Sequence, residues 1–215
     1  MTTKLIVWDW DGTLVDSFEV LRKAYNAARR EYGMSEWTLE EAHANIALSG
    51  RESFPMMFGE NADGAAKIFY DIYETEAPKS VVAKPERVAL LDMLLEKGVK
   101  QVIVSNKRGD ILRAECKALG WEHYFDAVIG AGDALIDKPA ADPVYLAYNQ
   151  AKVKVEANHL MIGDMPVDGQ TAKAAGIKGL LLIGETQTRE TLQDSADYVM
   201  EYKKLEGFLQ QYWGL

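Results

Sequence analysis

Two aspartates, Asp9 and Asp11, stand one residue apart at the end of a short apolar run, and Gly12 follows them directly. A rigidly held carboxylate can attack phosphorus, and a second carboxylate can protonate the leaving oxygen and later deprotonate the attacking water. A glycine lets the backbone turn sharply and leaves its N–H groups open to an anion. The stretch therefore predicts a nucleophile at Asp9, an acid/base at Asp11 and phosphate binding at Gly12.

Polar residues also follow three later apolar runs, in the groups Ser105-Asn106-Lys107, Asp137-Lys138-Pro139 and the stretch 163–169. The carboxyl ends of parallel strands lie at one edge of a sheet, where open α/β folds bind ligands. A lone Asp at such a position usually makes a turn or a helix cap, but polar residues at four strand ends together favour a functional site. We expect four carboxylates to converge there, beside Ser105 and Lys138: Asp9, Asp11, Asp164 and Asp168.

The expected carboxylate cluster raises a charge problem, because four close negative charges repel one another and one lysine does not balance them. A divalent cation with oxygen ligands would balance them. The sequence has no Cys/His cluster for zinc, so we expect a magnesium ion, Mg²⁺, with Mn²⁺ and Co²⁺ left open. Ser105 and Asn106 can donate hydrogen bonds to phosphate oxygens, and Lys138 supplies positive charge.

The apolar runs that precede these groups are short and rich in Leu and β-branched residues, which is typical of strands buried on both faces of a parallel sheet. They lie at 5–8, 101–105, 127–130, 159–163 and 179–183. Helical patterns at 86–97, 109–119 and 167–175 each end at a glycine, and Asp142 is expected to cap a helix that starts with Pro143. The alternation predicts an α/β fold, a doubly wound parallel sheet.

One connection is too long for an ordinary crossover, because about ninety residues separate the first two strands where a whole βαβ unit takes about thirty. The intervening segment shows only helical patterns, at 18–32, after the capping box of Thr38 and Glu41, and at 63–77. We therefore expect a helical cap domain at 17–82 inserted into a core domain formed by 1–16 and 83–215.

The cap is expected to select the substrate. Residues 48–53, LSGRES, are expected to form a break between two cap helices. Arg51 in this break is a candidate for binding a carboxylate or a second phosphate of the substrate. The alternative for Arg51 is a solvent-exposed loop arginine.

Composition limits the partners. The chain has 215 residues, with 24 Lys and Arg against 33 Asp and Glu, and a formal net charge of −9. This acidic balance argues against nucleic acid or an anionic membrane as the partner. Cys116 is the only cysteine, so no intrachain disulfide is possible, and no run approaches the roughly 18 apolar residues of a membrane span. With no signal-peptide pattern at the start, we expect a cytoplasmic protein, either a monomer or a homodimer.

Four stretches resemble, in order, the four motifs of the haloacid dehalogenase superfamily of phosphohydrolases: DWDGTLVDS, VSNK, the lysine of DKPAADP, and GDMPVDGQTAKAAG. The resemblance covers nearly the whole chain and implies that the helical insertion is a small cap. It also implies that Asp9 is the nucleophile and Asp11 the acid/base. The implied metal ligands are Asp9, the carbonyl of Asp11, and Asp164, with Asp168 in support. The implied phosphoryl-binding residues are Ser105, Asn106 and Lys138.

The subgroup that the chain most resembles is that of the phosphoglycolate phosphatase-like enzymes, which share the SNK and KPxxDP style of motif. The dehalogenases that name the superfamily lack the second Asp, so Asp11 indicates phosphate rather than halide. Trp10 departs from the smaller apolar residue usual at its position, and we expect only a difference in packing.

We expect a phosphatase acting on a small phosphorylated metabolite, either phosphoglycolate-like or a sugar phosphate. A phosphomutase of the β-phosphoglucomutase type is the alternative on the same scaffold. A phospho-accepting receiver domain is disfavoured by the paired aspartates on one strand and by the insertion, and a non-catalytic scaffold is disfavoured by the intact chemical positions.

The remaining polar residues have ordinary structural interpretations. Ser17 is expected to cap a helix. Lys107 and Arg108 are expected to be solvated, with substrate contact as the alternative. The histidines show no mutual spacing for a metal or a triad, and we expect each to be structural: His43, His123 and His159.

Overall fold

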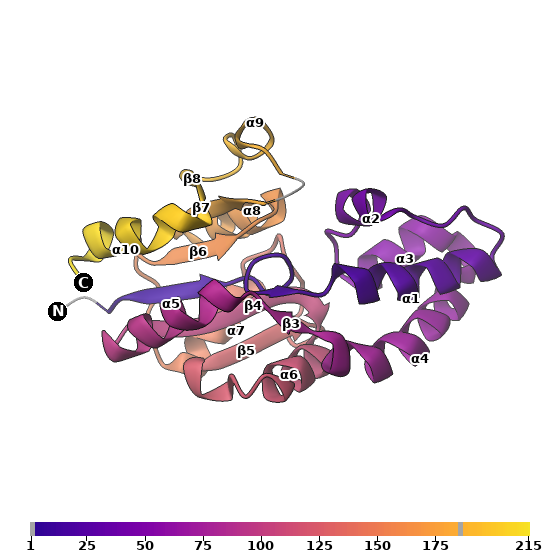
Figure 1. The fold of residues 1–215 in the computed structure, drawn as a ribbon, viewed down its shortest axis with the longest axis horizontal. Helices are drawn as coiled ribbons and strands as arrows, with labels where there is room; N and C mark the ends of the chain where they lie inside the picture. The colour runs from indigo at the N-terminus through magenta and orange to yellow at the C-terminus, as the bar shows by residue number, and fades with distance from the viewer. Residues whose placement is uncertain (1–2, 185–186) are drawn as a thin grey trace.

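A computed structural model describes residues 3–184 and 187–215, and its centre is a parallel β-sheet (Figure 1). In these residues the main sheet has six strands in the order β5-β4-β1-β6-β7-β8. The strands are β1 (Leu5–Trp8), β4 (Lys100–Arg108), β5 (Ala127–Ala131), β6 (Leu160–Gly163), β7 (Lys178–Ile183) and β8 (Tyr198–Glu201). Each of the five predicted runs forms a strand, so the predicted parallel α/β sheet is confirmed.

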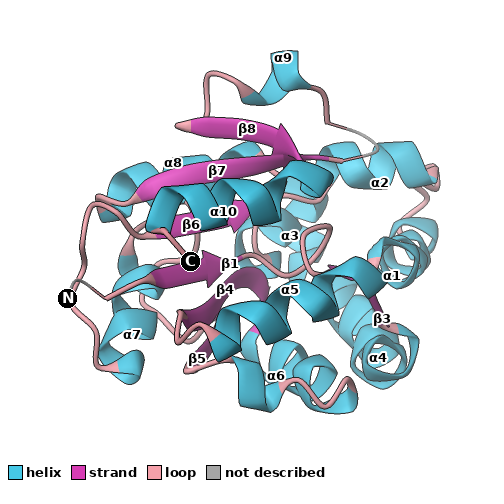
Figure 2. Ribbon diagram, turned by 60° about the vertical axis from the view of Figure 1, so that its left-hand side comes forward, coloured by secondary structure: helices cyan, strands magenta, loops and turns pink. Residues whose placement is uncertain are grey.

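Helices cover both faces of the sheet. Ile6 and Trp8 of β1 face α5 (Pro85–Glu96), α6 (Gly109–Ala118) and α10 (Leu205–Trp213), whereas Leu5 and Val7 face α7 (Asp142–Ala151) and α8 (Pro166–Ala175). Figure 2 shows α5 and α10 on the near side of the sheet. Because side chains alternate along a strand, a strand enclosed in this way is apolar at every position. All four residues of β1 are buried.

Two strands differ from the predictions: β8 was not predicted, and β4 is longer than predicted. β8 was not predicted, because it is an edge strand of four half-buried residues and lacks a long apolar run. β4 continues to Arg108, three residues past the predicted end, with a register shift against β5 between Val104 and Arg108. Asn106 and Lys107 are therefore part of the strand, and the side chain of Lys107 is turned inward.

The helix ends are close to the predicted ones. Asp142 is the first residue of α7 and Ala141 is the N-cap residue, so the predicted cap at Asp142 is wrong by one position. The short elements outside the main layers are α9 (Arg189–Leu192) and the 3₁₀ turns Gly59–Asn61, Glu122–Tyr124 and Tyr202–Lys204. Within the described residues, no helix combines the length and the apolar character that crossing a membrane requires.

The segment between the first two strands of the main sheet forms four helices that lie together beyond one edge of the sheet (Figure 1). They are α1 (Phe18–Glu31), α2 (Leu39–Asn45), α3 (Gly50–Phe58) and α4 (Ala62–Ser80). The capping box of Thr38 and Glu41 at the start of α2 is confirmed. The break expected at 48–53 is wrong beyond Ser49, because α3 begins at Gly50.

The four helices share an apolar core of their own, built around Tyr25, Phe54 and Phe69. A two-residue antiparallel pair, β2 (Val15–Asp16) and β3 (Val82–Ala83), joins the two chain crossings between this helical part and the sheet. So short a pair has no sequence periodicity and was not predicted. The division into a core at 1–16 and 83–215 and a cap domain at 17–82 stays a prediction.

His159 fixes the start of β6. Its side chain is fully buried, its Nε2 lies 2.9 Å from the carbonyl oxygen of Thr3, and its Nδ1 lies 2.9 Å from the hydroxyl of Tyr148. Because a carbonyl only accepts, Nε2 carries the proton and Nδ1 accepts from the tyrosine. Burial lowers the pKa of His159, since the imidazolium would lose its hydration. The histidine is structural, as expected.

We expect acid to destabilise the protein through His159. Its pKa is lowered in the folded state, so the unfolded chain binds the proton first, and the free energy of unfolding falls as the pH drops below the unfolded value of about 6.5. Urea unfolding at pH 7.5 and 5.5 measures this fall. His159→Gln should be less stable at pH 7.5 and show a smaller fall, whereas the His123→Gln control should keep the wild-type fall. Equal falls in all three proteins would contradict the assignment.

Candidate active site

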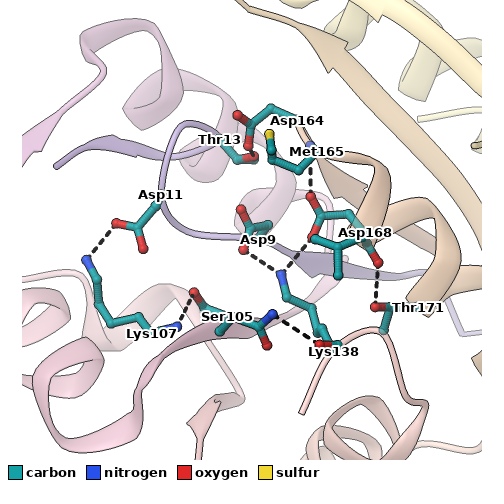
Figure 3. A network of polar contacts seen from close by, with 12 residues as sticks. Asp9, Asp11, Thr13, Ser105, Lys107, Lys138, Asp164, Met165, Asp168 and Thr171 are labelled. Carbon is teal, nitrogen blue, oxygen red and sulfur yellow. Dashed lines mark hydrogen bonds and ion pairs between the residues drawn. The ribbon is translucent and has the colours of Figure 1, made fainter. Parts of the chain in front are cut away.

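Three buried aspartates meet at the carboxyl edge of the sheet (Figure 3). Asp9 follows β1, Asp164 follows β6, and Asp168 lies in the first turn of α8. β1 and β6 are neighbouring parallel strands, so their ends lie side by side. One carboxylate oxygen from each aspartate lies within 4.8 Å of the others, and the three residues are 7%, 9% and 1% exposed, respectively. The predicted convergence is confirmed for these three residues.

Lys138 bridges two of the aspartates. Its Nζ donates to Asp9 Oδ1 and to Asp168 Oδ1, each at 2.7 Å, and its side chain is buried. Asp168 is itself held in place, because its Oδ2 accepts from the N–H of Met165 at 3.1 Å. Burial alone would lower the pKa of Lys138, but the carboxylates of Asp168 and Asp9 outweigh burial and raise it. Lys138 therefore stays charged at neutral pH.

The cluster carries more negative charge than Lys138 offsets. Burial raises the pKa of Asp9, and repulsion from Asp168 raises it further. Burial and Asp168 likewise raise the pKa of Asp164 to about 7, although the hydroxyl of Thr13 donates to Asp164 at 2.8 Å. A buried set of carboxylate oxygens with surplus negative charge is the chemistry that a hard divalent cation binds. The residues present therefore fit a metal site.

Gly12 is required by the geometry of the turn after Asp9. Its φ is +79°, which favours glycine, and a Cβ at this position would overlap the carboxylate of Asp164. Its N–H donates to the carbonyl of Val15 at 2.9 Å. The predicted open N–H at Gly12 is therefore wrong, because the turn itself uses this donor. Gly12 serves the site by giving Asp164 room.

Asp11 does not join the other three carboxylates, so that part of the predicted convergence is wrong. Its Oδ1 accepts from Lys107 Nζ at 2.6 Å and from the hydroxyl of Ser17. Figure 3 shows the Asp11 carboxylate turned away from Asp9 and toward Lys107. Ser17 is the N-cap residue of α1, but its hydroxyl bonds to Asp11 rather than to the helix.

Lys107 is buried, so the prediction of a solvated residue is wrong. Its Nζ pairs with Asp11 and with Glu115 of α6, which is itself fully buried. The pKa of Lys107 would fall on burial, but the two carboxylates outweigh this and raise it. The missed signal is in α6, where Glu115 follows the buried Ile111 by four residues and so lies on the apolar face of the helix.

Trp10 belongs to the same network. Its indole Nε1 donates to Glu115 Oε2 at 2.6 Å, and its ring packs edge-on against Trp121 with centroids 5.8 Å apart. The expectation that Trp10 changes only the packing is therefore incomplete. A smaller apolar residue at this position would leave Glu115 Oε2 with one donor fewer.

The two remaining predicted phosphate ligands, Ser105 and Asn106, differ in whether their hydrogen-bond donors are already used within the protein. Ser105 is buried, and its hydroxyl oxygen accepts from the N–H of Lys107 at 3.2 Å, so its proton remains to be donated. Asn106 Nδ2 donates to the carbonyls of Ala47 at 3.0 Å and Lys138 at 3.1 Å. The Asn106 amide thus links the cap to the core, and its N–H groups are engaged.

Arg51, the predicted substrate ligand, lies in the first turn of α3. Its guanidinium pairs with Asp137 in a two-pronged ion pair, with Arg51 Nη2 2.5 Å from Asp137 Oδ1. Asp137 is 2% exposed and directly precedes Lys138. The structure therefore places Arg51 as a second link between cap and core. The alternative of a solvent-exposed loop residue is right about the exposure but wrong about the loop, because Arg51 lies in a helix.

A cavity lies between the acidic cluster and the cap helices. Its floor on the sheet side includes Asp9, Ser105, Lys138 and Asp168, and its cap side comes from α1, α4 and the loop before α3. The candidate nucleophile and the candidate phosphoryl ligands thus lie at the base of one cavity, as expected of a small-molecule site.

Comparison with known proteins gives one family. Residues 6–182 match the haloacid dehalogenase-like hydrolase family. The chain is 29% identical over 181 residues to the phosphoglycolate phosphatase of Rhodobacter capsulatus, with 80% of each chain covered. It is 27% identical over 198 residues to the pyrophosphatase PpaX of Bacillus velezensis, with 91% of each chain covered.

Solved structures give the same fold. A predicted phosphatase from Clostridium acetobutylicum matches with a TM-score of 0.88 and 20% identity, covering 98% of this chain and 100% of that one. A haloacid dehalogenase-like family hydrolase from Streptococcus pneumoniae matches with a TM-score of 0.82 and 23% identity, covering 98% of both. Since the family match spans the sheet, the helical insertion and all four motif stretches, the chain belongs to the haloacid dehalogenase-like hydrolase family.

Proposed function

We propose that the protein is a Mg²⁺-dependent phosphatase that hydrolyses a small phosphorylated metabolite, phosphoglycolate-like or a sugar phosphate, through an aspartyl-phosphate on Asp9. The arrangement around Asp9 carries the proposal: its carboxylate ends a central strand, bonds to Lys138 at 2.7 Å and lies at the base of the cavity. The relatives named phosphoglycolate phosphatase and pyrophosphatase support hydrolysis at phosphorus.

Each residue takes one part of the reaction. An oxygen of Asp9 attacks phosphorus, while the hydroxyl of Ser105 and the ammonium of Lys138 donate to the phosphoryl oxygens. Asp11 protonates the leaving oxygen and then removes a proton from the water that cleaves the aspartyl-phosphate. Lys107 and Ser17 hold Asp11 Oδ1, so we assign the proton transfers to Oδ2.

Asp9, Asp164 and the backbone carbonyl of Asp11 would hold the Mg²⁺ ion, with Asp168 supporting them through Lys138 and Met165. When bound, Mg²⁺ supplies positive charge to the phosphoryl oxygens as negative charge develops there. The same charge offsets the repulsion among the buried carboxylates.

The acidic composition and the small cavity support a small-molecule partner rather than nucleic acid or membrane, and we propose a cytoplasmic enzyme. A phosphomutase of the β-phosphoglucomutase type would use the same residues but return the phosphoryl group to a sugar. No contact in the described residues favours it over transfer to water.

Asp9→Asn is expected to abolish phosphate release, because an amide does not attack phosphorus. The kcat should fall at least about a thousandfold. The measurement is phosphate release from a panel of small phosphate esters in Mg²⁺ and in EDTA, with thermal unfolding to confirm that the variant is folded. Wild-type release that survives EDTA, or release that survives the substitution, would refute the proposal.

Mg²⁺ is expected to stabilise the folded protein, because only the folded chain brings the three carboxylates together. At a concentration one hundred times the dissociation constant, the gain is about 2.7 kcal/mol. For a chain of this size the melting temperature should rise by roughly 5–10 °C. Asp164→Asn should melt higher than wild type without metal, because repulsion is relieved, and should respond less to Mg²⁺. The exposed Asp63→Asn control should respond like wild type, and an equal response in all three proteins would count against the site.

Lys107→Met is expected to destabilise the protein by about 3–5 kcal/mol, because it leaves the Glu115 carboxylate buried without its cation. Adding Glu115→Gln should recover part of this loss, since the unpaired charge is gone. Urea unfolding of the two single variants and the double variant gives the coupling energy. The kcat of Lys107→Met should also fall with little change in KM, because Asp11 loses its support. Additive effects on stability would show that the pair is not coupled.

A further inference from the structure

The wall of the cavity that faces the acidic cluster is built from apolar and aromatic side chains. They come from α1, α4 and the loop between α2 and α3, and they are Phe18, Leu21, Tyr25, Ile46, Leu48, Phe69, Tyr70 and Tyr73. The phosphoryl group is expected beside Asp9 and Lys138, so this wall meets the part of the substrate that leaves. Aromatic rings offer that part stacking and apolar contact rather than charge.

The cations that line the cavity in the described residues are already matched by carboxylates. Lys138 lies between Asp9 and Asp168. Lys107 has both Asp11 and Glu115 as partners. An anionic leaving group would find no unmatched ammonium here.

Two arginines near the cavity are matched as well: Arg108, which lines it from the end of β4, and Arg51, which lies in α3 next to the lining residue Gly50. Arg51 pairs with Asp137, and withdrawing Arg51 would leave a buried carboxylate unpaired, which is costly. Arg108 lies over the ring of Tyr70 at 4.2 Å and pairs with Glu74 and Asp110.

Two residues that line the cavity, Tyr73 and Asn106, each carry a buried, uncharged polar atom with no partner in the described chain: the hydroxyl of Tyr73 and Oδ1 of Asn106. Tyr73 is 2% exposed. The orientation of the Asn106 amide is set by the two carbonyls that its Nδ2 meets, so the free atom is the oxygen, an acceptor. A buried polar atom without a partner is destabilising, and a hydrogen bond with a substrate hydroxyl can offset that cost.

We propose that the substrate is the phosphate monoester of an uncharged, ring-bearing alcohol with at least one further hydroxyl, rather than phosphoglycolate or pyrophosphate. The ring lies against the aromatic wall, and the hydroxyl bonds to Tyr73 and Asn106. This rests on the proposed phosphatase activity. The Asp9–phosphorus bond forms as the ester P–O bond breaks, the proton of Asp11 goes to the alcohol oxygen, and water then releases phosphate.

A matched pair of esters tests the charge of the leaving group. Phosphoglycolate and 2-hydroxyethyl phosphate differ only in a carboxylate against a hydroxymethyl group. With Mg²⁺ present, kcat/KM should be at least about tenfold higher for 2-hydroxyethyl phosphate, which corresponds to about 1.4 kcal/mol. Glucose 6-phosphate or uridine 5′-monophosphate should be better still, and pyrophosphate poor. Preference for either ring compound supports the proposal and identifies the kind of ring.

Variants test the named contacts. Tyr73→Phe keeps the ring and removes the hydroxyl, so kcat/KM should fall about tenfold more for the preferred hydroxyl-bearing ester than for phenyl phosphate. Asp137→Asn releases Arg51 and should raise the phosphoglycolate to 2-hydroxyethyl phosphate ratio. If that variant does not fold, Glu74→Gln with Asp110→Asn releases Arg108 at the surface and should shift the ratio the same way. Asp126→Asn, which breaks the surface pair with Lys100, should leave the ratio at its wild-type value.

The outcomes separate this inference from the proposed function. Phosphoglycolate or pyrophosphate hydrolysed as fast as the uncharged esters would overturn the inference and leave the phosphatase assignment standing. An equal loss for phenyl phosphate and the hydroxyl-bearing ester in Tyr73→Phe would also overturn it. No phosphate from any ester, with folded protein and Mg²⁺, would remove the proposed function and this inference together.

Discussion

The surplus of buried negative charge at the carboxyl edge of the sheet is the constraint on which the site depends. Asp9, Asp164 and Asp168 lie within reach of one cation, and Lys138 offsets part of their charge. Such a cluster persists only where the chain leaves room for it. Side chains at Gly12 and Gly163 would overlap the carboxylates of Asp164 and Asp168, respectively, so both glycines keep the acidic groups close together.

The sequence predicts most of this arrangement, because the sheet and the cluster follow from strong local signals. Buried parallel strands are short apolar runs, and parallel strands end at one edge, so the meeting of Asp9, Asp164 and Lys138 follows from order along the chain. Elements with weak local sequence signals were not predicted. The edge strand β8 is only half-buried and lacks an apolar run, and the β2–β3 pair has two residues per strand, too few for a periodic pattern.

The errors at the site have a common cause, which is that pairing between charged side chains depends on tertiary contacts. The sequence alone predicts a solvated Lys107, but the continuation of β4 turns its side chain toward Glu115. Asp11 pairs with Lys107 and therefore lies apart from the other three carboxylates. The sequence alone predicts a loop at Arg51, but the residue lies in α3, where it pairs with Asp137. An ion pair between residues far apart in the chain has no characteristic sequence spacing. Its one local signal is a charged residue on an otherwise apolar helix face, as at Glu115.

These tertiary pairs also connect the helical insertion with the sheet. Asp137 receives Arg51 from the cap and directly precedes Lys138, which bonds to Asp9. Asn106 Nδ2 reaches the carbonyls of Ala47 in the cap and of Lys138 in the core. The helical insertion is therefore fixed to the same short segment that supplies Lys138. A cap displaced from the sheet would lose both links, so the position of the cap and the position of Lys138 are determined together.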